Sequence, residues 1–94
     1  MTRLRELLDE HLKEPFPTSV VKGLDYGGVD CVMVGSDIYG WASRVARGEP
    51  LPAEECERFR ALRMELVDAL PSFPESARPY YEALVEIADI ALRI

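Results

Sequence analysis

The sequence predicts an α+β domain in which a β-hairpin packs against four helices, in the chain order α-β-β-α-α-α. Leucines recur at helical spacing near the N-terminus, a Gly-Gly pair separates two stretches of strand-forming residues, and two long segments with helical apolar spacing fill the second half. With 94 residues, 48% of them hydrophobic and 30% charged, the chain is expected to form a single small globular domain over residues 1–94.

The first helix is predicted over residues 3–14 and should end at Pro15. Its apolar stripe follows the spacing i, i+3, i+4, i+7 and i+8 and consists of Leu4, Leu7, Leu8, His11 and Leu12. His11 is the only histidine in the chain. We expect it at the boundary of the core with one ring nitrogen hydrogen-bonded, because no metal or catalytic partner stands at a suitable spacing.

The hairpin is predicted over residues 19–34, with Gly27-Gly28 as a two-residue turn. This turn places Asp25 directly opposite Asp30. The second strand is apolar on both faces near its C-terminal end, which is typical of a strand covered on two sides.

Gly35-Ser36-Asp37 follows the predicted strand and precedes a helix predicted over residues 37–47. The segment lacks the lysine of a phosphate-binding loop and the glycine spacing of a dinucleotide fingerprint or a nucleophile elbow. We therefore interpret it as structural: glycine turns the chain, serine caps the helix and aspartate complements the helix dipole.

Two further helices are predicted, from about Pro52 to Leu70 and from about Ala77 to Arg93. The first of them carries three arginines among several acidic residues at i,i+3 and i,i+4 spacing. We expect these arginines to form a solvated, ion-paired helix face rather than a nucleic-acid recognition helix.

Polar residues around the hairpin are the best ligand candidates that the sequence offers. They are Asp25, Asp30, Ser36, Asp37 and Tyr39. Opposed carboxylates can hold a hard cation, but two of them are a thin ligand set, so neither a metal nor a cofactor is expected. No combination of residues suggests catalysis, and an enzymatic role is disfavoured.

The edges of a two-stranded sheet need a partner, because unpaired strand edges favour association. A homodimer that joins two hairpins into one sheet is one solution, and a partner protein that adds a strand is another. The interface candidates are Val20, Val21, Lys22, Leu24 and Tyr26.

The formal net charge of −6 disfavours binding to nucleic acid and suits a basic protein partner. Most of this acidity lies in the C-terminal half of the chain. No run of about 20 apolar residues could span a membrane, and the N-terminus is too charged for a signal peptide. We expect a cytoplasmic protein with no membrane partner and two reduced cysteines.

The runs "VDCVMVGSDIYGWASRV" and "LRMELVDALPSFPESARPYYEALVEIADIAL" resemble a family of short uncharacterised actinobacterial proteins of unknown function. The resemblance covers residues 29–92 and implies a bacterial cytoplasmic origin. It transfers no catalytic residue. The positions that carry it are Val29, Asp30, Asp37, Ile38, Gly40, Ser43, Leu70, Pro71, Ala77, Arg78, Tyr80, Tyr81 and Leu84.

Size, acidity and exposed strand edges together favour a non-enzymatic interaction protein. We expect a homodimer, or an immunity- or antitoxin-like partner of a basic protein. The alternative is a binder of a small molecule or metal, or a minor enzyme, with its site near Ser36, Asp37 and Tyr39.

Overall fold

The computed structural model describes residues 2–94 and confirms the order α-β-β-α-α-α. The helices are α1 (Thr2–Lys13), α2 (Met33–Ala46), α3 (Ala53–Ala69) and α4 (Arg78–Leu92). The strands are β1 (Asp25–Tyr26) and β2 (Val29–Asp30), and two 3₁₀ turns, η1 (Leu70–Ser72) and η2 (Glu75–Ala77), join α3 to α4. Across residues 2–94, none of the helices has the length and apolar character needed to span a membrane.

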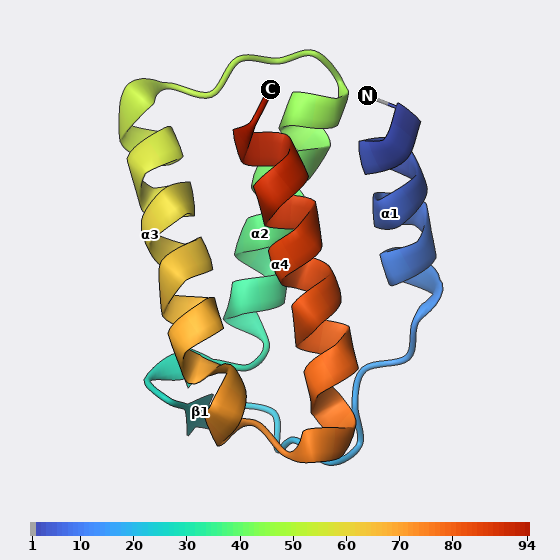
Figure 1. Cartoon of the computed structure of the whole chain (residues 1–94), viewed down its shortest axis with the longest axis vertical. Helices are drawn as coiled ribbons and strands as arrows, with labels where there is room; N and C mark the ends of the chain where they lie inside the picture. The colour runs from blue at the N-terminus through green and yellow to red at the C-terminus, as the bar shows by residue number, and fades with distance from the viewer. Residues whose placement is uncertain (1) are drawn as a thin grey trace.

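Helix α4 is the centre of the fold, because it packs against α1, α2 and α3. In Figure 1 it runs in front of α2, with α1 on one side and α3 on the other. The molecule measures 34 × 27 × 18 Å, and the shortest dimension leaves room for two layers of helices of about 10 Å each. The chain ends lie close together at one end, and the hairpin lies at the other.

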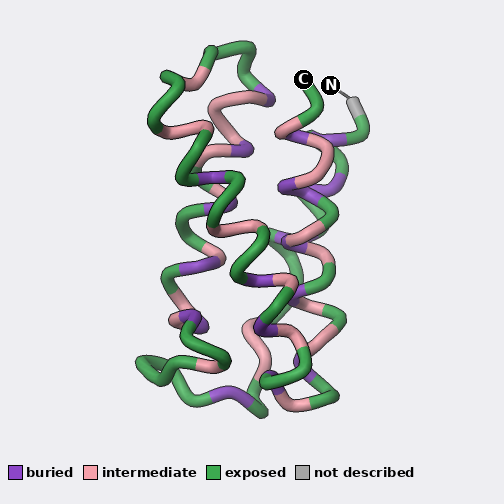
Figure 2. The backbone as a smooth tube through the Cα atoms, turned by 60° about the vertical axis from the view of Figure 1, so that its left-hand side comes forward, coloured by how far each residue is buried: buried purple, intermediate pink, exposed green. Residues whose placement is uncertain are grey.

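The core forms where the apolar stripes of the four helices meet, as the buried segments in Figure 2 show. Phe59 and Leu66 of α3 and Ile38 of α2 are fully enclosed. One face of α4 is buried in this interior. Its buried residues are Tyr81, Leu84, Ile87, Ala88 and Ala91.

The hairpin is much shorter than the predicted segment 19–34, because each strand has two residues. The predicted register is confirmed: Asp25 pairs with Asp30 across the turn. Gly27 and Gly28 have φ values of +59° and +83°, which only glycine adopts readily in succession. The local sequence therefore predicted the tight turn correctly, but it did not predict the length of the strands.

Helix α2 begins at Met33, so the prediction of a strand up to residue 34 and a helix from residue 37 was wrong. Gly35, Ser36 and Asp37 lie inside the helix and do not form a turn or a cap. The apolar run before them belongs to the first turn of α2. A short buried apolar run fits a strand and a helix equally well, which explains the error.

Candidate functional site

The side chain of Asp30 stabilises the turn that leads into α2. One of its carboxylate oxygens, Oδ1, accepts hydrogen bonds from the backbone N–H groups of Val32 (2.9 Å) and Met33 (2.8 Å). These bonds satisfy amides that have no partner within the helix. They also lower the pKa of Asp30, because they stabilise the ionised carboxylate. Asp30 therefore stabilises the turn before α2, whereas Ser36, which was expected to cap the helix, lies inside it.

The carboxylates proposed as ligands are not gathered into a metal site. Asp25 lies opposite Asp30 in the hairpin, and Asp37 lies on the exposed face of α2. Within residues 2–94, no group of three or more His, Cys, Asp or Glu side chains is close enough to hold a metal ion. Asp30 stabilises the turn before α2, and no third acidic side chain of the described residues lies close enough to form a metal site with it and Asp25.

Ser36 and Tyr39 instead line a cavity of about 480 Å³, which we call the α1–α2 cavity. It lies between the end of α1, the connector after it, the first turns of α2 and the start of α4. Its polar lining consists of His11, Glu14, Ser36, Tyr39 and Tyr80, and its apolar lining includes Leu12, Phe16 and Val32. Of the five ligand candidates from the sequence, these two share one site and the three aspartates lie outside it.

His11 is the least usual member of this lining, because only 9% of its surface is exposed. Its ring lies 4.5 Å from the ring of Tyr80, measured between centroids. Burial lowers its pKa, and the nearby carboxylate of Glu14 opposes that shift to a smaller extent. Nδ1 is buried and has no hydrogen-bond partner among the described residues.

The interface candidates before β1 lie in turns rather than on a strand edge. Val20 is buried, whereas Val21 and Leu24 are exposed apolar residues. The hydroxyl of Tyr26 accepts a hydrogen bond from the N–H of Val21 (2.9 Å), and its ring stacks on Phe73 at 5.1 Å. Tyr26 is thus committed to contacts within the molecule.

Lys22, the remaining interface candidate, also contacts its own chain. Its Nζ lies 5.3 Å from the centre of the Phe16 ring, in a cation–π arrangement. Because Phe16 lines the α1–α2 cavity, Lys22 brings a positive charge to the aromatic wall of that cavity without itself belonging to the lining.

The exposed face of α3 carries a row of acidic residues, which we call the α3 acidic stripe: Glu54, Glu57, Glu65 and Asp68. At 100° per residue, the four positions fall within roughly 80° of the helix circumference. Within the described chain, none of the four has an ion-pair partner within 4.0 Å (Arg, Lys or His). The predicted ion pairs along this helix are therefore not formed by these residues.

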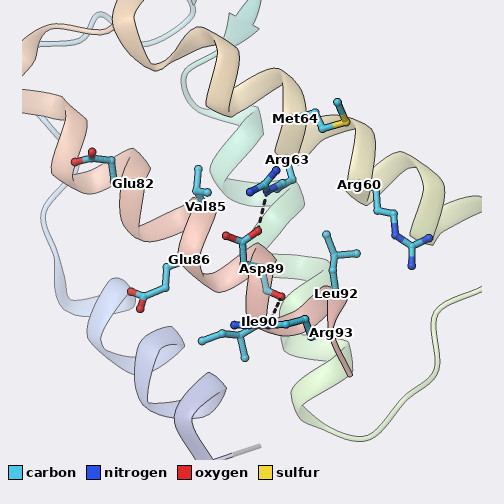
Figure 3. A pocket seen from close by; sticks show the side chains of 10 residues that line it. All are labelled: Arg60, Arg63, Met64, Glu82, Val85, Glu86, Asp89, Ile90, Leu92 and Arg93. Carbon is cyan, nitrogen blue, oxygen red and sulfur yellow. Dashed lines mark hydrogen bonds and ion pairs between the residues drawn. The ribbon is translucent and has the colours of Figure 1, made fainter.

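A groove of about 650 Å³ lies beside the stripe, between α3 and α4 (Figure 3). Arg63 of α3 crosses it to form an ion pair with Asp89 of α4 at 2.7 Å, rather than with an acid of its own helix. Met64 lies at its rim with 61% of its surface exposed. This groove combines apolar contact area with fixed charges.

The sequence did not identify Glu14 or Phe16 as site residues, and it placed His11 at the boundary of the core without linking it to a cavity. The signal that points to the cavity is a pair of glycines, Gly35 and Gly40, inside a helix, where glycine costs about 1 kcal/mol relative to alanine. Comparisons with protein-family models, with curated proteins and with solved structures found no match for this chain.

Proposed function

We propose that this protein acts by binding a basic protein through the α3 acidic stripe. The observation that supports the proposal is the unequal use of charge: most arginines are engaged within the molecule, whereas many acidic side chains face solvent without a partner. The formal net charge of −6 therefore arises largely from exposed carboxylates, which a partner protein could contact.

The arginines contact both acids and backbone carbonyl groups. Arg44 pairs with Glu55 at 2.8 Å, and the guanidinium of Arg5 donates two hydrogen bonds to the carbonyl of Ala46. The same holds elsewhere in the described chain for Arg3, Arg47, Arg63, Arg78 and Arg93. These contacts offset much of the positive charge of the arginines, although Arg58 and Arg60 of α3 are exposed beside the acids of the stripe.

The length and the surroundings of the α3 acidic stripe suit a protein-binding surface. It extends over roughly 20 Å of helix, at 1.5 Å per residue. Ala61, in its middle, leaves a shallow hollow bordered by Glu54, Glu57 and Arg58. The adjoining groove with exposed Met64 supplies apolar area, which interfaces combine with charge.

The partner we propose is a different protein rather than a second copy. Two-residue strands offer a shorter edge than the homodimer hypothesis requires. A stripe of like charge also repels a copy of itself. An immunity- or antitoxin-like protein, which neutralises a basic enzyme or toxin, is the class that best fits such a surface.

The test is site-specific cross-linking in extracts of the native host, with a photoreactive phenylalanine analogue in place of Ala61. We expect one basic protein to be captured, and its yield to fall at least tenfold in the charge-reversed variant E57K/E65K/D68K. The matched control reverses three exposed acids elsewhere, Asp9→Lys, Glu10→Lys and Asp37→Lys, and should retain most of the yield. Equal loss in both variants, or capture of an acidic protein, would contradict the proposal.

A further inference from the structure

The α1–α2 cavity has the features of a small-molecule site that is separate from the α3 acidic stripe. We propose that it binds a small organic ammonium ion with an apolar body. The volume of about 480 Å³ lies within the range of ligand-binding cavities, and the lining combines aromatic rings with a few polar groups. Charge, aromatic geometry and an unpaired buried nitrogen support this ligand class in turn.

Within the lining, the carboxylate of Glu14 favours a cation over an anion, and the ammonium group of Lys22, which lies over the ring of Phe16, offsets part of this preference. Glu14 is the charged side chain at the cavity, and no arginine or lysine lines it among residues 2–94. An anion would have to approach this carboxylate in a protein that is already negative overall. An ammonium ion would gain from both.

Aromatic rings form part of the wall of the cavity. Phe16, Tyr39 and Tyr80 all line it, and the rings of Phe16 and Tyr80 meet edge to face at 5.8 Å. The faces of such rings attract cations. The ammonium group of Lys22 already lies over the ring of Phe16, so we expect a ligand cation to use the rings of Tyr39 and Tyr80 instead.

His11 adds a hydrogen-bonding group that its own chain leaves unused. Its ring is more than nine-tenths buried, lines the cavity, and has an Nδ1 atom without a partner in the described chain. Because burial lowers its pKa, the ring is neutral near pH 7 and does not repel a cation in the cavity.

The cavity stays open because α2 has no side chain at two positions of its wall. A Cβ atom added at Gly40 would meet nothing within 4 Å, and one added at Gly35 would meet a methyl group of Leu84 at 3.7 Å. Neither glycine has a positive φ. Neither is therefore required by the backbone or by close packing, and their effect is to leave space beside Ser36 and Tyr39.

The test is a titration of the ¹⁵N-labelled protein with phenethylammonium at pH 7.5, followed by amide chemical shifts in NMR spectra. Phenylacetate and 2-phenylethanol serve as anionic and neutral probes of similar shape. We expect saturable shifts for Glu14, Ser36 and Gly40 with a millimolar dissociation constant, and at least tenfold weaker binding of phenylacetate. Equal responses to the cation and the anion, or shifts that map elsewhere, would overturn the proposal.

Two variants and a control separate the causes. Gly40→Leu fills the cavity while favouring helix, so the protein should stay folded and lose binding at least tenfold. Glu14→Gln should reduce the affinity for phenethylammonium to that for 2-phenylethanol. Ala61→Leu places the same side chain on exposed α3 and should leave binding unchanged. Binding that survives Gly40→Leu would overturn the assignment, and none of these results depends on the basic partner of α3.

Discussion

The hairpin and the α1–α2 cavity both adjoin the first turn of α2, yet they are packed to different extents. At the hairpin, a Cβ added to Gly27 would lie 2.9 Å from the Cα of Ala69, and the carboxylate of Asp30 accepts two backbone hydrogen bonds in the turn before α2. At the cavity, a Cβ added to Gly40 meets nothing, and Nδ1 of His11 lacks a partner among the described residues.

The difference shows that glycine has two separate uses in one short stretch of this chain. Gly27 is required by a positive φ and by the approach of α3, so its removal must disturb the fold. Gly40 has neither a positive φ nor a close neighbour that would exclude a side chain. A residue that weakens a helix without serving the packing is best explained by the space it leaves, which is the argument for a ligand site.

Gly27→Ala should have the largest effect among the changes that probe this comparison. A left-handed backbone costs alanine about 1–2 kcal/mol, and forcing a methyl group against Ala69 costs about 1–3 kcal/mol more. We expect the free energy of unfolding to fall by about 2–5 kcal/mol, measured by urea denaturation.

Gly28→Ala is the matched control for this change. Gly28 also has a positive φ, of +83°, but a Cβ there meets nothing within 4 Å. We expect only the backbone cost, about 1–2 kcal/mol. If both variants were equally stable, the close contact between the hairpin and α3 would not contribute to folding.

The parts of the fold that the sequence predicted depend on local chemistry. Gly27-Gly28 specifies a tight turn by itself, and the turn then fixes the pairing of Asp25 with Asp30. The start of α2 could not be predicted in the same way. The side chain of Asp30 holds the turn before the helix, and nothing in the apolar run that follows distinguishes a strand from a helix.

The α1–α2 cavity was only partly predictable for a different reason. Ser36 and Tyr39 were among the candidates because they lie close to the hairpin in sequence. His11 and Tyr80 come from α1 and α4, and they meet α2 only after the helices have packed. Helix periodicity identifies which face is buried, but it does not say which residues of other helices will face it.

Gly40→Ala tests the loosely packed side of the comparison and should have a smaller effect of opposite sign. Alanine is favoured over glycine inside a helix by about 0.5–1 kcal/mol, and here the added methyl group meets no neighbour. We expect the free energy of unfolding to rise by that amount, measured under the same denaturing conditions. A decrease in stability would show that Gly40 is needed for the fold and would remove the packing argument for the cavity.

The smallest effect should be a dependence of stability on pH that originates at His11. In the folded protein, burial lowers the pKa of His11 below the value of 6.5 expected in the unfolded chain, and Glu14 offsets part of this shift. Between the two pKa values the unfolded chain binds more protons, so the free energy of unfolding is fully retained above pH 6.5 and falls as the pH decreases below it.

The measurement is urea denaturation at pH 7.5 and pH 5.5, for the natural protein and for His11→Phe. Phenylalanine keeps a ring beside Tyr80 but does not titrate, so the variant should lose less stability on acidification. The shift of Asp30 does not interfere, because its lowered pKa places its loss of stability below pH 3.8. An identical pH dependence in both proteins would mean that His11 is no less basic when folded. The neutral ring assumed at the α1–α2 cavity would then have to be abandoned.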